Sequence, residues 1–163
     1  MNIKHLKEPY VLVLIGPPLS GKDHFIRQNF SDKDVVMISR DQILLDVYGS
    51  DNYDEAFKNV DQKKVDVELA NQLRQASVDK KNVIINMTNM TSKRRSHNLS
   101  YFSDDYLKVA VIFPILEWDE YRRRNLKRQQ EEKKSIPEQV IKNMISSYQP
   151  IREEEGFDKV ISL

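Results

Sequence analysis

Two glycines and a lysine near the N terminus stand at a spacing with definite chemical consequences. Residues 16–23 read Gly-Pro-Pro-Leu-Ser-Gly-Lys-Asp and fit the pattern G-x-x-x-x-G-K. Such glycines let successive backbone N–H groups turn inward around a phosphate, and a helix that begins at the lysine directs its positive dipole end at the same anion. The lysine then reaches the β- and γ-phosphates of a nucleoside triphosphate. The residues predicted to hold that triphosphate are Gly16, Pro17, Pro18, Leu19, Ser20, Gly21, Lys22 and Asp23.

The context of this pattern favours phosphate binding over a chance match. Two glycines and a lysine at fixed spacing occur by accident in roughly one chain in twenty, but here an apolar run precedes them and a helical pattern follows. Asp23 stands where the usual pattern has a Ser or Thr that binds Mg²⁺. Because a carboxylate is also a hard oxygen ligand, we predict that Asp23 binds magnesium. Its negative charge leaves a second interpretation open, a loop that binds nucleotide weakly or not at all.

Polar side chains follow the second and third predicted strands. Asp41, with Arg40 before it, comes directly after the second strand, where we expect it one strand away from the phosphate loop. A carboxylate at that edge can accept a proton from an attacking hydroxyl, as a general base must, or can simply cap the next helix. Thr88 and Asn89 follow the third strand and can hold a substrate by hydrogen bonds or cap a helix. Taken alone, capping is the favoured explanation for this second pair.

A strongly basic segment follows the fourth predicted strand. It predicts a helix over 118–130, a polar connection over 129–135, and a second helix over 137–148. Two helices joined in this way are typical of a lid that closes over a site, and lid arginines can stabilise charge on a transferring phosphoryl group. The lid is therefore predicted over residues 118–148. The three arginines at 122–124 point to different faces of the helix, so we expect at least one of them to be only solvated.

The remaining pattern consists of short apolar runs that alternate with longer amphipathic stretches, which is typical of an α/β parallel sheet. The predicted strands are 10–15, 35–38, 82–86, 109–113 and 159–162, and the further helices are 22–30, 41–48, a long helix over 55–79, and 92–102. We expect a doubly wound five-stranded sheet in a single domain, residues 1–163. In such sheets ligands bind beyond the carboxyl ends of the strands.

Composition narrows the class of protein. The chain has 163 residues, 31% charged and 39% hydrophobic, so one substantial core is expected beneath a charged surface. A net charge of +1 gives no general attraction to nucleic acid, so any polyanion site must be local. The absence of cysteine excludes disulfides and thiolate metal sites. The longest apolar run is too short to span a bilayer and the N terminus lacks the apolar core of a signal peptide, so we expect a cytoplasmic protein with no membrane partner.

Four segments together resemble the kinase domain of the phage-type 5′-polynucleotide kinases, within the wider P-loop kinase group. The likeness extends from about residue 10 to residue 148. In order, the segments are Gly16–Lys22, Arg40-Asp41, Thr88-Asn89 with Arg94-Arg95, and in the lid Arg124–Arg128 with Ile136-Pro137 and Val140–Met144.

This resemblance implies a P-loop kinase fold, ATP and Mg²⁺ as cofactors, and transfer of the γ-phosphoryl group to a 5′-hydroxyl end of DNA or RNA. It implies that Lys22 cradles the phosphates and that Asp41 is the general base. Arg128, and secondarily Arg124, would clamp the donor phosphates. The residues that would lie at the acceptor are Arg40, Asp41, Thr88 and Asn89.

Three positions depart from the family pattern. The family has Ser or Thr at Asp23, a carboxylate at Met87, and at Leu44 an arginine that holds an acceptor phosphate. We hypothesise that Asp23 replaces both the missing hydroxyl and the missing carboxylate as support for Mg²⁺. Leu44 leaves open a different acceptor hydroxyl, such as one on a hydroxymethylated base in DNA, a nucleoside or a small metabolite. A non-catalytic nucleotide-binding module is the remaining alternative.

Overall fold

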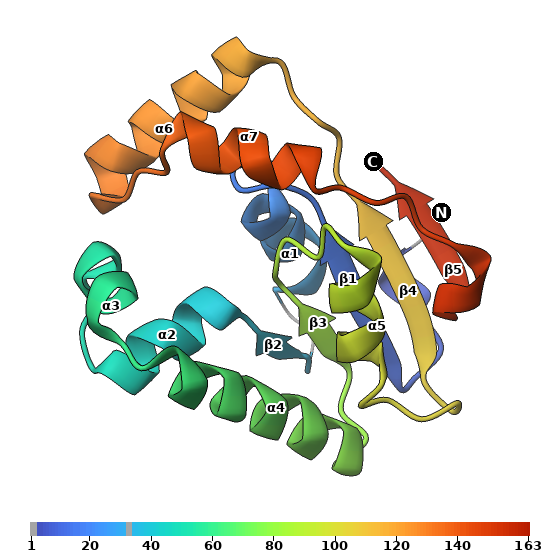
Figure 1. Ribbon diagram of the computed structural model, residues 1–163. Helices are drawn as coiled ribbons and strands as arrows, with labels where there is room; N and C mark the ends of the chain where they lie inside the picture. Colours follow the sequence, from blue (N-terminus) through green and yellow to red (C-terminus); the bar gives the residue numbers. More distant parts are fainter. Residues whose placement is uncertain (1–2, 32–33) are drawn as a thin grey trace.

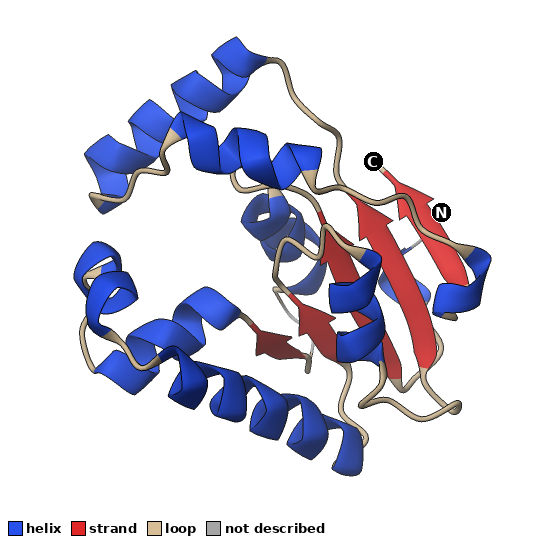
Figure 2. Ribbon diagram, in the orientation of Figure 1, coloured by secondary structure: helices blue, strands red, loops and turns tan. Residues whose placement is uncertain are grey.

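The computed structural model of the protein describes residues 3–31 and 34–163, and its centre is a five-stranded sheet (Figures 1 and 2). Every pair of neighbouring strands is parallel, in the order β2-β3-β1-β4-β5. The predicted parallel α/β sheet is therefore confirmed. The strands are β1 (Tyr10–Ile15), β2 (Val36–Ile38), β3 (Val83–Ile85), β4 (Leu107–Ile112) and β5 (Lys159–Ser162).

Helices cover both faces of this sheet. They are α1 (Lys22–Phe30), α2 (Arg40–Tyr48), α3 (Tyr53–Asn59), α4 (Gln62–Val78), α5 (Ser92–Leu99), α6 (Trp118–Glu132) and α7 (Glu138–Ser146), with short 3₁₀ helices η1 (Ile3–His5) and η2 (Glu153–Glu155). Successive residues of a strand point to opposite faces. Leu12 accordingly packs in a cluster with Phe25 and Phe30 of α1, whereas Val13 packs in a second cluster with Leu73 of α4. Because both faces are covered, all of β1 is buried.

The long helix predicted over 55–79 is wrong, because the chain breaks it into α3 and α4. Val60 ends α3 in an extended conformation, and the carboxylate of Asp61 caps α4 by accepting a hydrogen bond from the Lys63 backbone N–H at 3.0 Å. The apolar spacing continues through the break, so periodicity alone did not reveal it. Smaller differences concern the ends of elements: α5 stops at Leu99 instead of residue 102, and α6 continues to Glu132.

The order of the strands also corrects one expectation about the site. The strand β3 lies between β1 and β2, so Asp41 at the start of α2 is two strands away from the phosphate loop instead of one. The chain leaves a place beside β1 when it crosses to β2, and β3 later fills that place. The carboxyl ends of β1, β2 and β3 still share one edge of the sheet, because all three run in parallel.

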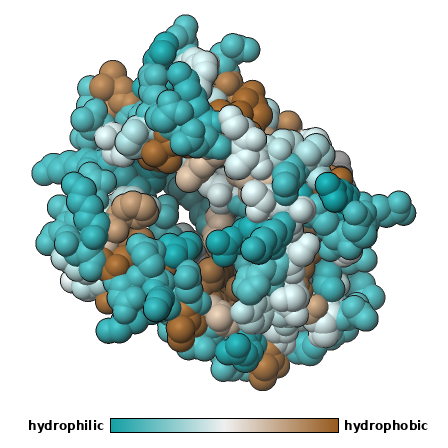
Figure 3. Space-filling view, in the orientation of Figure 1, coloured by the Kyte–Doolittle hydropathy of each residue, from teal (hydrophilic) through white to brown (hydrophobic). Residues whose placement is uncertain are grey.

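Two groups of helices project beyond this edge and face each other. Figure 1 shows α6 and α7 on one side, and α2 and α3 on the other. The space-filling view in Figure 3 shows a hollow between them, bordered mainly by hydrophilic residues. Within the described residues, the helices are all too short or too polar to cross a membrane.

Candidate active site

The loop between β1 and α1 has the backbone shape of a phosphate cradle. Leu19 and Gly21 both have positive φ angles, 66° and 101°, so the chain turns sharply before α1. A Cβ atom at Gly16 would lie 2.8 Å from Phe113 Cβ, a separation that side chains do not tolerate. Gly21 is the N-cap of α1, and because glycine has no side chain, the first N–H groups of the helix are left to an incoming anion.

Lys22 folds back onto this loop. Its ammonium group donates hydrogen bonds to the backbone oxygens of Gly16 at 2.9 Å and Pro17 at 2.7 Å, and lies 3.3 Å from Ser20 Oγ. Burial lowers the pKa of Lys22 to about 8, while the charge of Asp41 acts in the opposite direction and raises it. The ammonium therefore lies against the loop, and phosphate oxygens can replace the carbonyl oxygens that it now contacts.

Asp23 lies in the first turn of α1, next to the end of β3. Its Oδ1 accepts a hydrogen bond from Asn86 Nδ2 at 2.8 Å, and the residue is exposed. Within residues 3–31 and 34–163, the acidic, histidine and cysteine side chains form no cluster of three that could hold a metal ion by themselves. Mg²⁺ commonly takes one or two carboxylates and completes its shell with water and substrate phosphates, so a lone Asp23 fits that role.

The side chain of Asp41 contacts residues from both groups of helices. Ser39, not Asp41, caps α2 through the Gln42 backbone N–H at 3.4 Å, so the capping interpretation of Asp41 is wrong. The Asp41 carboxylate instead accepts a hydrogen bond from the Tyr53 hydroxyl at 3.0 Å and lies 3.5 Å from Lys134 Nζ. Lys134 belongs to the connection between α6 and α7, so the predicted base directly contacts the lid.

Tyr53 and Lys134 pack against each other beside Asp41. The Lys134 ammonium lies 3.8 Å from the centre of the Tyr53 ring, and its side chain is only 15% exposed. Burial and the negative charge of Asp41 raise the pKa of the Tyr53 hydroxyl, which therefore remains a donor. Burial lowers the pKa of Lys134, and the charge of Asp41 opposes that effect. Sequence reasoning missed both residues, because nothing in their spacing indicates that they meet.

The lid arginines separate into two kinds. Arg122 and Arg123 are more than half exposed and pair with acidic neighbours on the lid itself, in line with the expectation that at least one of the three is only solvated. Arg124 donates a hydrogen bond from one NH group to the Leu19 backbone oxygen at 2.9 Å, so it contacts the phosphate loop. Arg128 is 22% exposed, lies 3.3 Å from Glu132, and its charge lowers the pKa of Lys22. Both predicted clamp residues thus act on the phosphate loop or its lysine.

The residues predicted at the acceptor do not all point to the cleft. Arg40 donates hydrogen bonds to Gln62 at 3.0 Å and to Asp66 at 2.9 Å, so its guanidinium binds α4. Asn89 is 1% exposed and donates to the Leu14 backbone oxygen at 2.7 Å. Its side chain therefore fixes the loop after β3 to the end of β1, instead of meeting a substrate. Thr88 is half-buried, and its backbone oxygen accepts a hydrogen bond from the Gly16 N–H at 3.0 Å.

A buried ion pair joins α5 to η2, close to the end of the lid. The side chains of Arg95 and Glu155 are 0% and 3% exposed and lie 2.7 Å apart. Arg95 also donates to the backbone oxygens of Met90 at 3.1 Å and Gln149 at 2.8 Å. The backbone N–H of Gln149, which follows α7, donates to the Met90 oxygen at 2.8 Å, and its Oε1 accepts from the Ser92 N–H at 2.8 Å. Arg95, matched to the family pattern in the sequence, thus has a structural role.

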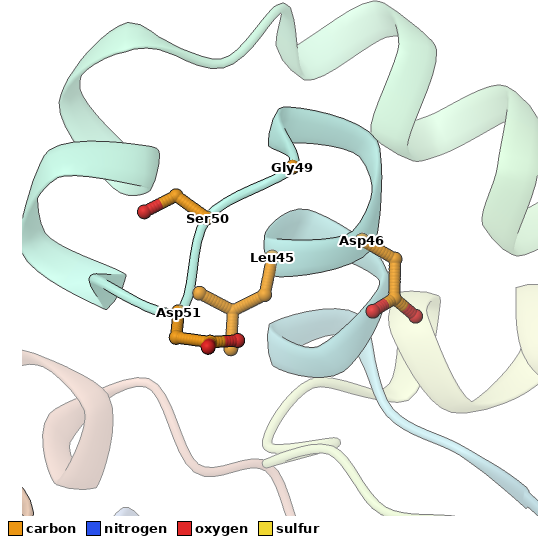
Figure 4. A pocket seen from close by; sticks show the side chains of 5 residues that line it. All are labelled: Leu45, Asp46, Gly49, Ser50 and Asp51. Atoms are coloured by element: carbon orange, nitrogen blue, oxygen red, sulfur yellow. The ribbon is translucent and has the colours of Figure 1, made fainter.

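A separate pocket lies at the C-terminal end of α2 and is not part of this cleft. Its lining residues, seen in Figure 4, are Leu45, Asp46, Gly49, Ser50 and Asp51. Asp46 and Asp51 give it a negative charge, which does not suit a phosphate. The candidate active site lies elsewhere, at the carboxyl edge of the sheet, where Arg124 contacts the phosphate loop at 2.9 Å and Lys134 of the lid lies 3.5 Å from Asp41.

A five-stranded parallel sheet, a phosphate loop directly after its central strand and a two-helix lid define a P-loop kinase fold. Residues 11–151 match the family described as an AAA domain (AAA_33), and the chain belongs to this family. No curated protein resembles the chain closely enough to count as a relative.

Several solved structures share this fold. A chain of the Pnkp1/Rnl/Hen1 RNA repair complex matches with a TM-score of 0.69 at 20% identity, over 90% of this chain and 46% of that one. A chain of the PezAT chromosomal toxin–antitoxin system of Streptococcus pneumoniae matches with a TM-score of 0.64 at 17% identity, over 98% and 68%. A gluconokinase from Sinorhizobium meliloti 1021 matches with a TM-score of 0.56 at 10% identity, over 97% and 83%.

At these identities the likeness shows the fold alone. Because the chain spans less than half the length of the RNA repair chain, the partners and reactions of that larger protein do not transfer with the fold. What the comparisons establish for this chain is a P-loop kinase-like domain, a fold that implies a bound nucleotide.

Proposed function

We propose that this chain transfers the γ-phosphoryl group of ATP to a 5′-hydroxyl end of DNA or RNA. One observation carries the proposal: the lid contacts both sides of the cleft, because Arg124 donates to the Leu19 oxygen of the phosphate loop at 2.9 Å and Lys134 lies 3.5 Å from Asp41. The charges of Asp41 and Arg128 also act on the pKa of Lys22. A lysine for the donor phosphates, a carboxylate for the acceptor hydroxyl and a cation on a lid are the parts that phosphoryl transfer requires.

In the proposed reaction, Asp41 accepts the proton of the acceptor hydroxyl. The hydroxyl oxygen then forms a bond to the γ-phosphorus, and the bond between that phosphorus and the β–γ bridging oxygen breaks, so that ADP leaves. Lys22 exchanges the Gly16 and Pro17 carbonyl oxygens for oxygens of the β- and γ-phosphates. Arg128, supported by Arg124, stabilises the charge that accumulates on the transferring group.

Mg²⁺ would enter with ATP and neutralise charge on the phosphate oxygens. Asp23 would hold it, because this exposed carboxylate stands at the first turn of α1 and Asn86 fixes one of its oxygens at 2.8 Å. An Asp23→Ala variant is expected to lose most of its Mg²⁺-dependent transfer. Full retention of that activity would exclude Asp23 as the metal ligand, whatever the acceptor.

A second candidate keeps the same chemistry but changes the acceptor. Leu44 is 1% exposed, so it contributes to the core and offers nothing to a phosphate beside Asp41. The net charge of +1 also gives no general affinity for a polyanion. The buried Leu44 thus leaves open, as the alternative, a hydroxyl on a hydroxymethylated base in DNA, whereas the net charge favours a nucleoside or a small metabolite.

Transfer of label from γ-labelled ATP tests the proposal directly. The acceptors are 5′-hydroxyl oligonucleotides of DNA and RNA, duplex DNA with hydroxymethylated bases, and free nucleosides. We expect label on the 5′-hydroxyl oligonucleotides, loss of label with Asp41→Asn, and loss of ATP binding with Lys22→Ala. Label only on another acceptor would establish the second candidate. Tight, Mg²⁺-dependent ATP binding without transfer to any acceptor would leave a non-catalytic nucleotide-binding module.

A further inference from the structure

Phe57 is exposed although it lies next to the candidate active site. All 14 aromatic residues of the chain belong to the described part, and Phe57 is the only one of them classed as exposed, with 55% of its surface open to solvent. Burying a phenylalanine side chain stabilises a fold by about 1.5–3 kcal/mol. An exposed side chain of this kind is common on protein surfaces, so the significance of Phe57 depends on where it lies.

The position of Phe57 connects it to Asp41. Phe57 lies four residues after Tyr53 on α3, so both rings are on the same face of the helix. Their centres are 6.0 Å apart and the ring planes differ by 25°, which is a stacked arrangement. Tyr53 donates its hydroxyl hydrogen bond to Asp41 at 3.0 Å and carries the Lys134 ammonium 3.8 Å from its ring centre. The aromatic surface made of Tyr53 and Phe57 thus begins at the predicted base and ends in solvent.

We propose that this aromatic surface stacks against the nucleobase of the terminal nucleotide of the acceptor. The proposal rests on the function proposed above, because it assumes that the 5′-hydroxyl reaches Asp41. A 5′-hydroxyl and its base belong to one nucleotide, so a hydroxyl at Asp41 brings that base beside Tyr53 and Phe57. Stacking on an aromatic ring accepts any base, since every base has a π-face.

Charge supports the same occupant. The Lys134 ammonium lies over the Tyr53 ring, and Arg128 is close enough for its charge to lower the pKa of Lys134. Cations interleaved with exposed aromatic rings are the usual surface for single-stranded nucleic acid. A small sugar or carboxylate acceptor would use the cations but would leave the exposed surface of Phe57 open to solvent.

The test compares two 5′-hydroxyl oligonucleotides of the same sequence. The first has an intact 5′-terminal nucleotide, and the second lacks only the base of that nucleotide. Wild type, Phe57→Ala and Phe57→Trp are assayed for kcat/KM with each oligonucleotide. Val67→Ala, a truncation of another apolar side chain that is 61% exposed on α4, is the matched control. ATP affinity and thermal unfolding of each variant show whether the fold and the donor site remain intact.

Loss of the terminal base is expected to lower kcat/KM of the wild type by about 5-fold to 150-fold, the range that stacking of one base provides. Phe57→Ala should bring the ratio between the two oligonucleotides close to one, whereas Phe57→Trp and Val67→Ala should keep it. Equal losses with both oligonucleotides, or no loss, would overturn the stacking site while leaving 5′-hydroxyl transfer in place. Absence of transfer by the wild type to either oligonucleotide would overturn the proposed function and the stacking site with it.

Discussion

Removal of the Lys134 side chain should open the lid. Lys134 is the contact between the lid and Asp41 in the cleft, and its ammonium has two partners, the Tyr53 ring at 3.8 Å and the Asp41 carboxylate at 3.5 Å. A partly desolvated cation over an aromatic ring contributes about 0.5–2 kcal/mol. Because Asp41 is 57% exposed, the ion pair adds only about 0–1 kcal/mol. A total of about 0.5–3 kcal/mol corresponds to a change of about 2-fold to 150-fold in the ratio of closed to open lid.

The absence of cysteine from the chain makes this change measurable by spin labels at two introduced cysteines. Gln130→Cys on α6 and Lys58→Cys on α3 place labels at exposed positions on the two sides of the cleft. We expect Lys134→Ala to shift the label–label distance distribution to longer values and to raise KM for ATP. The control is Lys133→Asn, which removes the neighbouring exposed charge and keeps a residue that tolerates the φ angle of 51° at that position.

The reasoning would be refuted by a Lys134→Ala protein whose distance distribution and KM for ATP equal those of the parent. It would be refuted equally by a Lys133→Asn protein that opens to the same extent, because a general loss of positive charge would then explain the result. Lys134→Arg tests whether the cation itself holds the lid closed, since arginine retains a cation over the Tyr53 ring.

Three further predictions concern stability and the phosphate loop. Glu155→Ala should lower the free energy of unfolding by about 3–5 kcal/mol in denaturant titrations, because it leaves the buried Arg95 charge without its partner. The control Glu154→Ala, at an exposed neighbouring position, should lower the free energy of unfolding by less than about 1 kcal/mol. Equal effects of the two substitutions would contradict this explanation. The pKa of Lys22 is about 8 in the folded protein, against an ordinary value of 10.5. The unfolded chain therefore binds more protons between these pH values, and the free energy of unfolding should rise with pH across this window, by at most about 3 kcal/mol. The same rise in a Lys22→Met protein would show that another group causes it. Gly16→Ala places a Cβ atom 2.8 Å from Phe113 Cβ and Ser20 Oγ. Calorimetry should therefore show a loss of about 1–3 kcal/mol in the free energy of unfolding, together with weaker ATP binding. Normal ATP affinity in this variant would argue against the proposed phosphate-binding role of the loop.

The phosphate loop was predictable because its chemistry is local. The spacing of Gly16, Gly21 and Lys22 determines a backbone turn and a helix start within a few residues, and an apolar run before it identifies the strand. The sheet and its parallel direction followed from the alternation of short apolar runs with amphipathic segments. The strand order could not be predicted in the same way. The apolar sequences of β1 and β3 indicate that both strands are buried, but they do not indicate which strands are neighbours in the sheet.

The acceptor side of the cleft was less predictable because it depends on contacts between distant residues. Tyr53 and Lys134 are 81 positions apart in the sequence, and only the folded chain brings them to Asp41. Asn89 shows the opposite difficulty: a polar residue after a strand suggested a ligand contact, whereas its amide is buried against the Leu14 backbone oxygen at 2.7 Å. Local sequence cannot distinguish a polar side chain that serves a substrate from one that serves the backbone.

Attachment of the lid at both of its ends determines how it can move. Gln149 is hydrogen-bonded to Met90, Ser92 and Arg95, and at the other end the Phe113 N–H donates to the Ile15 oxygen of β1 at 2.8 Å. A lid whose ends are both attached to the rest of the protein turns about those attachments, and displacement grows with distance from them. Figure 1 shows the turn between α6 and α7, to which Lys134 belongs, far from the segment that follows α7. A small rotation of the lid near Gln149 therefore displaces Lys134 more than residues close to the sheet, and so can break its contact with Asp41.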